Sequence, residues 1–372
     1  MKKLPLLVLM AFMLQQSTVI AQEFGPGFNK EEYLEMMRIS VQTTLVDEYI
    51  AQYQPPVSFF RAYQSPVMGL ENYYDLWLNE DRTAAVFSIR GTTTQQESWL
   101  ENIFAAMIPV RGELQLAPNE MFEYALATHP EAAVHAGWTV GMAFIARDAI
   151  PKIRDLAQRK IRNIYIVGHS QGGAIAYLLT AQLRHMQQAG TLSEKIRFKT
   201  YCSAAPKPGN LYFAYDYEAL TQNGWGFNVV NSADWVPEVP MSIQTFDDFN
   251  RINPLLHVDD LIRAQKLPQR IVAKHIFNHL DKPTRKAQQR YEKYLGELTE
   301  RAVKNRIEGL ILPPFVQTNN YVRTGTTIVL QPDEEYRQLY PDDPKQIFGH
   351  HYHGPYMLLT QKLGTPFYEA ED

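Results

Sequence analysis

Apolar positions along this chain form two kinds of pattern, short unbroken runs and longer stretches that repeat every three or four residues. The unbroken runs predict buried strands, because a strand covered on both faces is apolar at every position. The run at residues 164–167 is fully apolar, and the more mixed stretches at 84–89, 198–203, 227–231 and 321–330 are predicted as strands as well. The periodic stretches predict helices at residues 136–157, interrupted by Pro151, at 173–188 and at 356–363. Strands that alternate with helices at this spacing predict an α/β domain with a mainly parallel central sheet flanked by helices.

The pattern changes between about residues 247 and 311. The stretch from Lys282 to Ile311 is long, charged and helix-periodic, which indicates a solvated helical insertion. No internal repeat or low-complexity linker is visible in the sequence. We therefore expect residues 22–372 to form a single domain that carries this mainly helical insertion.

The N-terminal residues follow the layout of a secretory signal peptide. Lys2 and Lys3 precede the apolar stretch from Leu4 to Leu14, and a polar segment then leads to Ala21. The apolar core is too short to be a stable membrane anchor. We expect residues 1–21 to be a signal peptide of a secreted or periplasmic bacterial protein; a buried N-terminal helix and a retained anchor are the alternatives.

Composition narrows the function classes. Of 372 residues, 45% are hydrophobic and 20% are charged, as in ordinary globular proteins. The net charge of −4 comes without a long block of like charges, so we expect no nucleic-acid partner. Cys202 is the only cysteine, so no internal disulfide can form, and nothing after residue 21 is apolar enough to predict a membrane span.

A serine flanked by glycines marks the candidate chemistry. Residues 168–173 read Gly-His-Ser-Gln-Gly-Gly and lie between a predicted strand and a predicted helix. Such a corner strains the backbone at Ser170, and Gly168 and Gly172 remove side chains that would clash. The helix N-terminus and the backbone N–H of Gln171 then favour a developing oxyanion. We predict a nucleophile elbow around Ser170 that includes His169; a tight turn with a capping serine is the alternative.

A serine nucleophile needs a base and an acid that orients the base. Asp234 follows the predicted strand 227–231, so it is expected at the same sheet edge as Ser170. His350, His351 and His353 precede the last predicted helix. The residue pattern leaves all three histidines open as the base, and a zinc site built on them is the alternative.

Several segments together resemble the class 3, or fungal-type, lipases of the α/β-hydrolase superfamily, over roughly residues 80–240 and 320–365. They are Ile-Arg-Gly-Thr at 89–92, Val-His-Ala-Gly-Trp at 134–138, the elbow at 168–173, Asp-Trp-Val-Pro-Glu-Val-Pro at 234–240 and His-Gly-Pro-Tyr-Met at 353–357. The resemblance implies an α/β-hydrolase fold and a catalytic triad of Ser170, Asp234 and His353. It also implies an oxyanion hole made by Thr92 and the backbone N–H of Gln171, without a metal or cofactor.

The same resemblance implies a lid over the site. Trp99, Leu100, Ile103, Phe104 and Met107, followed by Ile108, are spaced as on one face of a helix. Such a stripe would cover an acyl pocket in water and turn outward at a lipid–water interface. An ordinary core helix is the alternative, and it would favour soluble substrates.

We therefore predict a secreted serine ester hydrolase, a lipase that cleaves acylglycerol esters through an acyl-enzyme at a lipid–water interface. A phospholipase A1 or an esterase of soluble acyl substrates is the alternative of the same chemistry. A lipid-binding protein of this fold without catalysis is the alternative of a different class.

Overall fold

A seven-stranded sheet forms the centre of the computed structural model, which describes residues 24–253 and 257–364. Its strands lie in the order β1-β2-β3-β8-β9-β11-β13. Their bounds are β1 Phe59–Gln64, β2 Tyr74–Asn79, β3 Ala84–Ile89, β8 Asn163–His169, β9 Arg197–Ser203, β11 Gly226–Asn231 and β13 Thr326–Leu330. From β3 to β13 every pair is parallel, and only β1 and β2 are antiparallel. The α/β prediction with a mainly parallel sheet is confirmed.

Two smaller sheets lie beside the central one. A four-stranded sheet has the order β12-β10-β7-β4, and β5 and β6 form a hairpin. The bounds are β4 Met107–Pro109, β5 Arg111–Ala117, β6 Glu120–Ala125, β7 Ala133–His135, β10 Gly209–Asn210 and β12 Tyr321–Val322.

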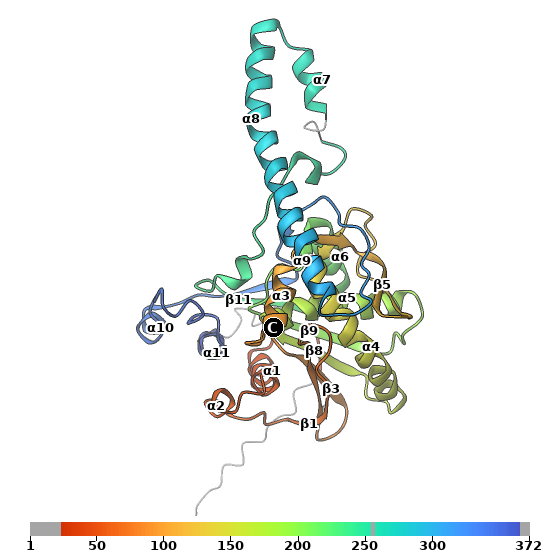
Figure 1. Cartoon of the computed structure of the whole chain (residues 1–372). Coiled ribbons are helices and arrows are strands. Elements are labelled where there is room, and N and C mark those ends of the chain that lie inside the picture. The colour runs from red at the N-terminus through yellow and green to blue at the C-terminus, as the bar shows by residue number, and fades with distance from the viewer. Residues whose placement is uncertain (1–23, 254–256, 365–372) are drawn as a thin grey trace, which may run out of the picture.

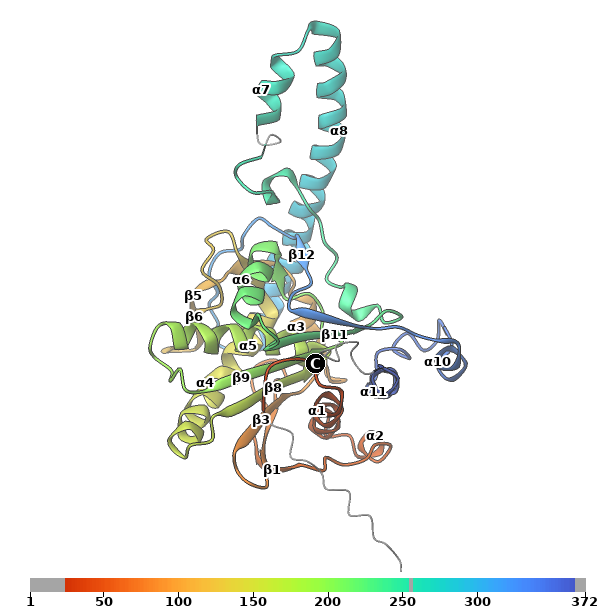
Figure 2. The same ribbon diagram turned by 180° about the vertical axis from the view of Figure 1, so that it is seen from behind.

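Helices cover both faces of the central sheet (Figures 1 and 2). The α-helices are α1 Lys30–Thr43, α2 Asp47–Ile50, α3 Gln96–Ile103, α4 Ala136–Gln158, α5 Gln171–Gln188, α6 Leu211–Thr221, α7 Val258–Arg263, α8 Leu267–Glu292, α9 Leu298–Lys304, α10 Glu334–Leu339 and α11 His353–Gln361. The described residues also include two 3-10 turns, η1 Val236–Glu238 and η2 Phe246–Asp248, and a π-helical turn, η4 Lys293–Glu297.

Alternate residues of the strands point into two separate cores. In β8, Ile164 and Ile166 pack with α4 and α5, whereas Tyr165 and Val167 pack with α1 and α11. A strand turns successive side chains to opposite faces, so an unbroken apolar run is what a sheet covered on both sides requires. This is why the short runs predicted the strands well.

Two helix predictions need correction. Helix α4 continues through Pro151 instead of being interrupted there. Proline removes one backbone hydrogen bond from a helix, but α4 buries a long apolar face, and this packing compensates for the loss. The last helix begins at His353, so His353 is a helical residue and does not lie in the preceding loop.

The region predicted as a helical insertion holds α7, α8, η4 and α9. Helices α7 and α8 form a hairpin that stands out from the body of the molecule, as Figures 1 and 2 show from opposite sides. The predicted signal peptide, residues 1–21, lies outside the described residues. Among the helices that the structure describes, none combines the length and apolarity needed to cross a bilayer.

A buried ion pair attaches α1 to the sheet. The Glu32 carboxylate accepts hydrogen bonds from the hydroxyl groups of Tyr165 and Tyr201, and it lies 2.6 Å from Lys199 Nζ. Lys199 is only 2% exposed. Removing one member of such a pair leaves the other charge buried without compensation.

We expect Glu32→Ala to lower the free energy of unfolding by about 3–5 kcal/mol, because Lys199 would remain buried and unpaired. Glu31→Ala is the matched control, since the neighbouring Glu31 side chain is 70% exposed; it should change stability by no more than about 0.5 kcal/mol. Denaturant unfolding of the two variants measures both values, and equal effects would contradict the assigned role of the pair.

Candidate active site

Ser170 stands at the corner between β8 and α5 in a strained backbone conformation, with φ 61° and ψ −132°. A β-carbon on Gly168 would lie 2.1 Å from the carbonyl oxygen of Gly172, and one on Gly172 would lie 2.2 Å from that of Ile89. Only glycine fits at these two positions. The Ser170 N–H donates to the carbonyl oxygen of Ser203, 2.9 Å away, which ties the corner to β9. The strand–turn–helix context predicted for the serine is therefore present.

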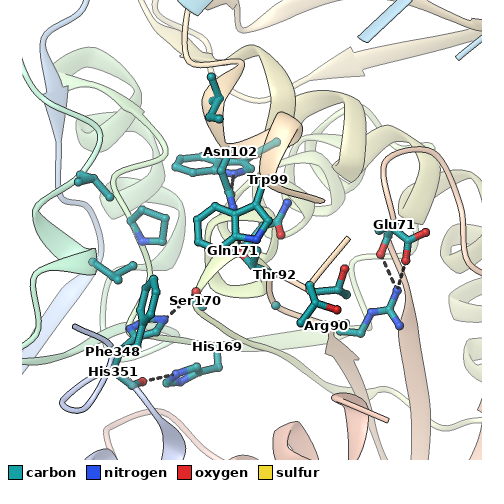
Figure 3. Close-up of a pocket in the computed structure, with 18 of the residues that line it drawn as sticks. Glu71, Arg90, Thr92, Trp99, Asn102, His169, Ser170, Gln171, Phe348 and His351 are labelled. Carbon is teal, nitrogen blue, oxygen red and sulfur yellow. Dashed lines mark hydrogen bonds and ion pairs between the residues drawn. The ribbon is translucent and has the colours of Figure 1, made fainter. Parts of the chain in front are cut away.

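The structure joins Ser170, a histidine and Asp234 in one chain of hydrogen bonds. His351 Nε2 lies 2.8 Å from Ser170 Oγ, and His351 Nδ1 lies 2.8 Å from Asp234 Oδ2 (Figure 3). Because a carboxylate only accepts, Nδ1 carries the ring proton, and Nε2 is left to accept from the serine hydroxyl. This is the arrangement of a serine nucleophile with its base.

His353, which the sequence resemblance favoured as the base, does not contact Ser170. Its Nδ1 lies 2.9 Å from the Tyr49 hydroxyl and its Nε2 lies 3.0 Å from Ser40 Oγ, so both ring nitrogens are engaged elsewhere. Burial, helped by the neighbouring His351, lowers the pKa of His353 to about 3. The prediction of His353 is wrong, because the geometry gives the base position to His351, two residues earlier.

His169 connects the nucleophile corner to the loop that carries His351. Its Nε2 lies 2.7 Å from the His351 carbonyl oxygen and must donate to it, so Nδ1 accepts from the Ser203 hydroxyl, 3.2 Å away. The Ser203 hydroxyl in turn accepts from the Tyr33 hydroxyl at 2.6 Å. Burial and the two nearby histidines hold the pKa of His169 well below its ordinary value, so the ring stays neutral and this polarity is fixed.

Two further donors hold the Asp234 carboxylate in place. Its Oδ1 accepts from the backbone N–H of Val236 at 3.0 Å, and its Oδ2 accepts from the Tyr356 hydroxyl at 2.8 Å. Asp234 is 4% exposed, so these bonds replace water around the buried charge. Tyr356 belongs to the motif at residues 353–357, but nothing in that local pattern indicated that its side chain reaches a distant carboxylate.

Thr92 and Gln171, the predicted oxyanion residues, both line the pocket beside Ser170 (Figure 3). Asn102 Nδ2 donates to Thr92 Oγ1 at 2.9 Å, and Asn102 Oδ1 accepts from Trp138 Nε1 at 2.9 Å. Sequence reasoning missed Asn102. Asn102 lies between the residues of the predicted apolar stripe, and the apolar pattern gave no sign that this polar side chain positions Thr92.

The predicted lid stripe is not one helical face. Helix α3 ends at Ile103; Phe104 follows the helix and is fully buried, and Met107 begins β4 and is also buried. The helix stops there because the carbonyl oxygens of Phe104 and Ala106 accept from the first N–H groups of α4. The prediction is therefore wrong for Phe104 and Met107, which belong to the core.

Trp99 and Ile103 do lie at the pocket, and they are 42% and 48% exposed. Leu100 is partly buried and packs against the main core. The opposite side of α3 is held by polar contacts: Ser98 Oγ donates to Gln171 Oε1 at 3.0 Å, and Glu101 Oε2 accepts from Asn72 at 2.7 Å. In this structure α3 thus forms one wall of the pocket and is held in place by these hydrogen bonds.

The motif Val-His-Ala-Gly-Trp at residues 134–138 adds to this attachment. His135 Nδ1 accepts from the Trp138 N–H at 3.2 Å, and its Nε2 donates to the carbonyl oxygen of Asn102, also at 3.2 Å. Burial lowers the pKa of His135 to about 3, which keeps the ring neutral as this pattern requires. A β-carbon on Gly137 would lie 2.0 Å from the carbonyl oxygen of Glu101, so glycine allows α3 and α4 to meet.

A pocket of about 800 Å³ opens onto Ser170. Its walls come from segments far apart in the sequence, and most of its side chains are apolar or aromatic. They include Leu45, Val46, Trp99, Trp138, Tyr291, Leu295 and Phe348. Arg90, paired with Glu71, lies at a more polar part of the wall (Figure 3). A chamber of this lining suits an acyl chain with its ester group at Ser170.

The three clustered histidines point to different partners. His350 contacts the Tyr336 hydroxyl and Asp342, whereas His351 and His353 have the partners given above. Within the described part of the chain, no three histidine, cysteine, aspartate or glutamate side chains are grouped as ligands for a metal ion.

Comparison with known proteins adds the family. Residues 86–243 match the family model described as lipase (class 3). We call this matched stretch the class 3 lipase segment. A Caenorhabditis elegans lipase, ZK262.3, is 34% identical over 87 residues, which are 23% of this chain and 22% of that protein. The match thus spans about a fifth of that curated relative.

Solved fungal lipases are also similar to this chain. The Lip2 lipase of Yarrowia lipolytica is 17% identical with a TM-score of 0.43, and the match covers 58% of this chain and 76% of that chain. Lipase II of Rhizopus niveus is 18% identical with a TM-score of 0.42, and the match covers 57% of this chain and 74% of that chain.

The match confirms the sequence-based resemblance to the class 3 lipases over residues 86–243. The segment contains Ser170, Asp234 and Thr92. His351, Tyr356 and the α7–α8 hairpin lie beyond it. The histidine that contacts Ser170 therefore lies outside the matched region.

Glu101, inside the class 3 lipase segment, is a buried carboxyl group whose Oε1 has no hydrogen-bond partner. Burial raises its pKa from 4.5 to about 8. Between these two values the folded protein holds a proton that the unfolded chain has lost, so stability falls as the pH rises through this window.

We expect Glu101→Gln to remove this dependence, which amounts to at most about 1.4 kcal/mol per pH unit. Denaturant unfolding at several pH values between the two pKa values measures the slope. Glu97→Gln on the same helix is the control, since Glu97 is partly exposed and paired with Arg306, and it should keep the wild-type slope. An unchanged slope in Glu101→Gln would contradict the assigned proton.

Proposed function

We propose that this protein is a serine ester hydrolase of the lipase type, in which Ser170, His351 and Asp234 form the catalytic triad. The observation that supports this most directly is the unbroken chain from Asp234 Oδ2 through His351 to Ser170 Oγ, with two links of 2.8 Å. The triad proposed from the sequence is kept for Ser170 and Asp234, with His351 in place of His353.

The proposed reaction follows from this geometry. Ser170 Oγ attacks the ester carbonyl while His351 Nε2 takes the hydroxyl proton, and Asp234 stabilises the imidazolium that forms. The N–H groups of Thr92 and Gln171 are proposed to bind the oxyanion of the tetrahedral intermediate, each contributing about 10²–10³ in turnover. His351 then returns the proton to the leaving alcohol, and a water molecule hydrolyses the acyl-enzyme by the same steps.

The proposed substrate is an acylglycerol or a related lipid ester. Support comes from the class 3 lipase segment and from the largely apolar pocket of about 800 Å³ around Ser170. Since α3 is pinned by buried polar contacts, Trp99 and Ile103 are proposed to act as a fixed wall of the acyl site, with no requirement for lid opening. We further propose export through the signal-peptide layout of residues 1–21.

Replacement of the nucleophile tests the proposal. Ser170→Ala should lower kcat on a short-chain nitrophenyl ester by about 10⁴–10⁶, because no other group can form the acyl-enzyme. A fluorophosphonate probe should label the wild-type protein and fail to label the variant. Retained activity or retained labelling would exclude Ser170 as the nucleophile, and a panel of acylglycerols, phospholipids and soluble esters would then assign the substrate class.

The two histidines can be separated by a matched pair of variants. His351→Ala should lower kcat by about 10⁴ or more, since the base is lost. His353→Gln should keep activity within about tenfold, because His353 contacts only Tyr49 and Ser40 through its ring nitrogens. Rates measured on the same soluble ester compare them, and the reverse order would restore His353 as the base.

A further inference from the structure

The hairpin of α7 and α8 carries apolar side chains that nothing in the described structure covers. Leu267, Ile271, Val272, Ile276 and Leu280 of α8 are between 54% and 71% exposed. Such a group is unusual on an otherwise solvated element. Other residues of the hairpin are packed: Ile262 of α7 is buried, and Phe277 of α8 stacks on Phe246 of η2, with ring centroids 5.1 Å apart.

The exposed residues of α8 are arranged in rows. Val272, Ile276 and Leu280 recur every four residues, so they form one stripe along the helix. Arg270, Lys274 and Lys282 form a second row, about 160° around the helix from the first at 100° per residue. Leu267 and Ile271 lie on the side of the basic row, whereas the stripe of Val272, Ile276 and Leu280 lies on the opposite side of α8 and is also exposed.

Charge distinguishes the hairpin from the rest of the chain. Residues 258–292 contain eight lysine or arginine residues and four aspartate or glutamate residues, whereas the whole chain has a net charge of −4. The hairpin is thus a cationic element on an acidic protein. Its complement is an anionic surface that also offers an apolar layer, which is the chemistry of a bilayer containing acidic phospholipids.

The hairpin is continuous with the rim of the pocket. At the base of α8, Gln288 Nε2 donates to the Gln317 carbonyl oxygen at 2.7 Å, and Arg285 pairs with Asp247. Tyr291 and Leu295, which follow along the same helical segment, line the pocket that opens onto Ser170. The 26 residues of α8 span about 39 Å, so this helix leads from the pocket to a distant tip (Figure 1).

We infer that the α7–α8 hairpin is a docking element for anionic lipid surfaces. The stripe of Val272, Ile276 and Leu280 enters the boundary between headgroups and acyl chains, and the basic side chains contact the lipid phosphates. Docking holds the enzyme at the surface where its substrate is found. The usefulness of docking rests on the proposed function, but lipid binding by the hairpin does not require catalysis.

The test measures vesicle binding by co-sedimentation of the full chain carrying Ser170→Ala, so that lipids stay intact and failure of the proposed chemistry leaves the result unaffected. Vesicles of phosphatidylcholine with phosphatidylglycerol should bind the protein at least about tenfold better than phosphatidylcholine alone, and added salt should weaken the binding. No binding to the anionic vesicles would overturn the inference.

Two hairpin variants and one control locate the contact. V272S/I276S/L280S should lose at least about tenfold of the binding to anionic vesicles. R270Q/K274Q/K282Q should lose the preference for anionic over neutral vesicles. V57S/V67S/M121S removes apolar side chains of similar exposure, 52–67%, from other elements and should bind as the parent does.

Folding is checked by circular dichroism, and the same hairpin substitutions in the chain with Ser170 intact should leave the rate on a soluble ester unchanged. Equal binding by V272S/I276S/L280S and by the control would overturn the inference. Concentration-dependent dimerisation that V272S/I276S/L280S abolishes, in the absence of vesicle binding, would do so too and would replace the lipid by a second copy of the chain.

Discussion

The hydrogen bond from His169 Nε2 to the carbonyl oxygen of His351 is the constraint on which the site depends. It joins two segments that are 182 positions apart, the corner with Ser170 and the loop with His351. Its direction is fixed by a relay in which Tyr33 donates to Ser203 and Ser203 donates to His169. Because burial keeps His169 neutral, the relay cannot reverse by protonation near neutral pH, and His351 stays aligned with Ser170.

Buried hydrogen bonds also hold α3 beside the pocket. Asn102 orients Thr92 through its side chain while its carbonyl oxygen accepts from His135, and Ser98 contacts the first residue of α5. Exposed apolar residues on one side of the helix thus depend on buried polar contacts on the other. Moving α3 as a rigid lid would break several buried hydrogen bonds together, and each unsatisfied group would cost about 1–3 kcal/mol. A pocket that is open without such movement avoids this cost.

The sequence predicted the parts of the molecule that are determined locally. Apolar runs predicted β3 and β8, because those strands are covered on both faces of the sheet. The glycines around Ser170 predicted the sharp corner there, because no side chain fits at Gly168 or Gly172. The choice among the three histidines could not be made this way. His351 and His353 differ only in which distant residues meet them, Asp234 and Ser170 for one and Ser40 and Tyr49 for the other. The roles of Tyr356 and Asn102 were missed for the same reason, because their partners lie in other segments of the chain.

The two ends of α8 face opposite physical demands. Near its base, Tyr291 and Leu295 line the pocket, and the Ala106 N–H donates to the Leu295 carbonyl oxygen, so substitutions there alter the pocket wall. Toward the tip, in the part of α8 before residue 282, the side chains of Val272, Ile276 and Leu280 are exposed to solvent. They therefore add little to the stability of the central domain. Aliphatic residues at such positions have no folding role to explain them, whereas a charged surface would be more soluble. An exposed apolar stripe opposite a basic row suits a helix at a lipid interface, and its distance from Ser170 and His351 lets the surface contact change without altering those residues.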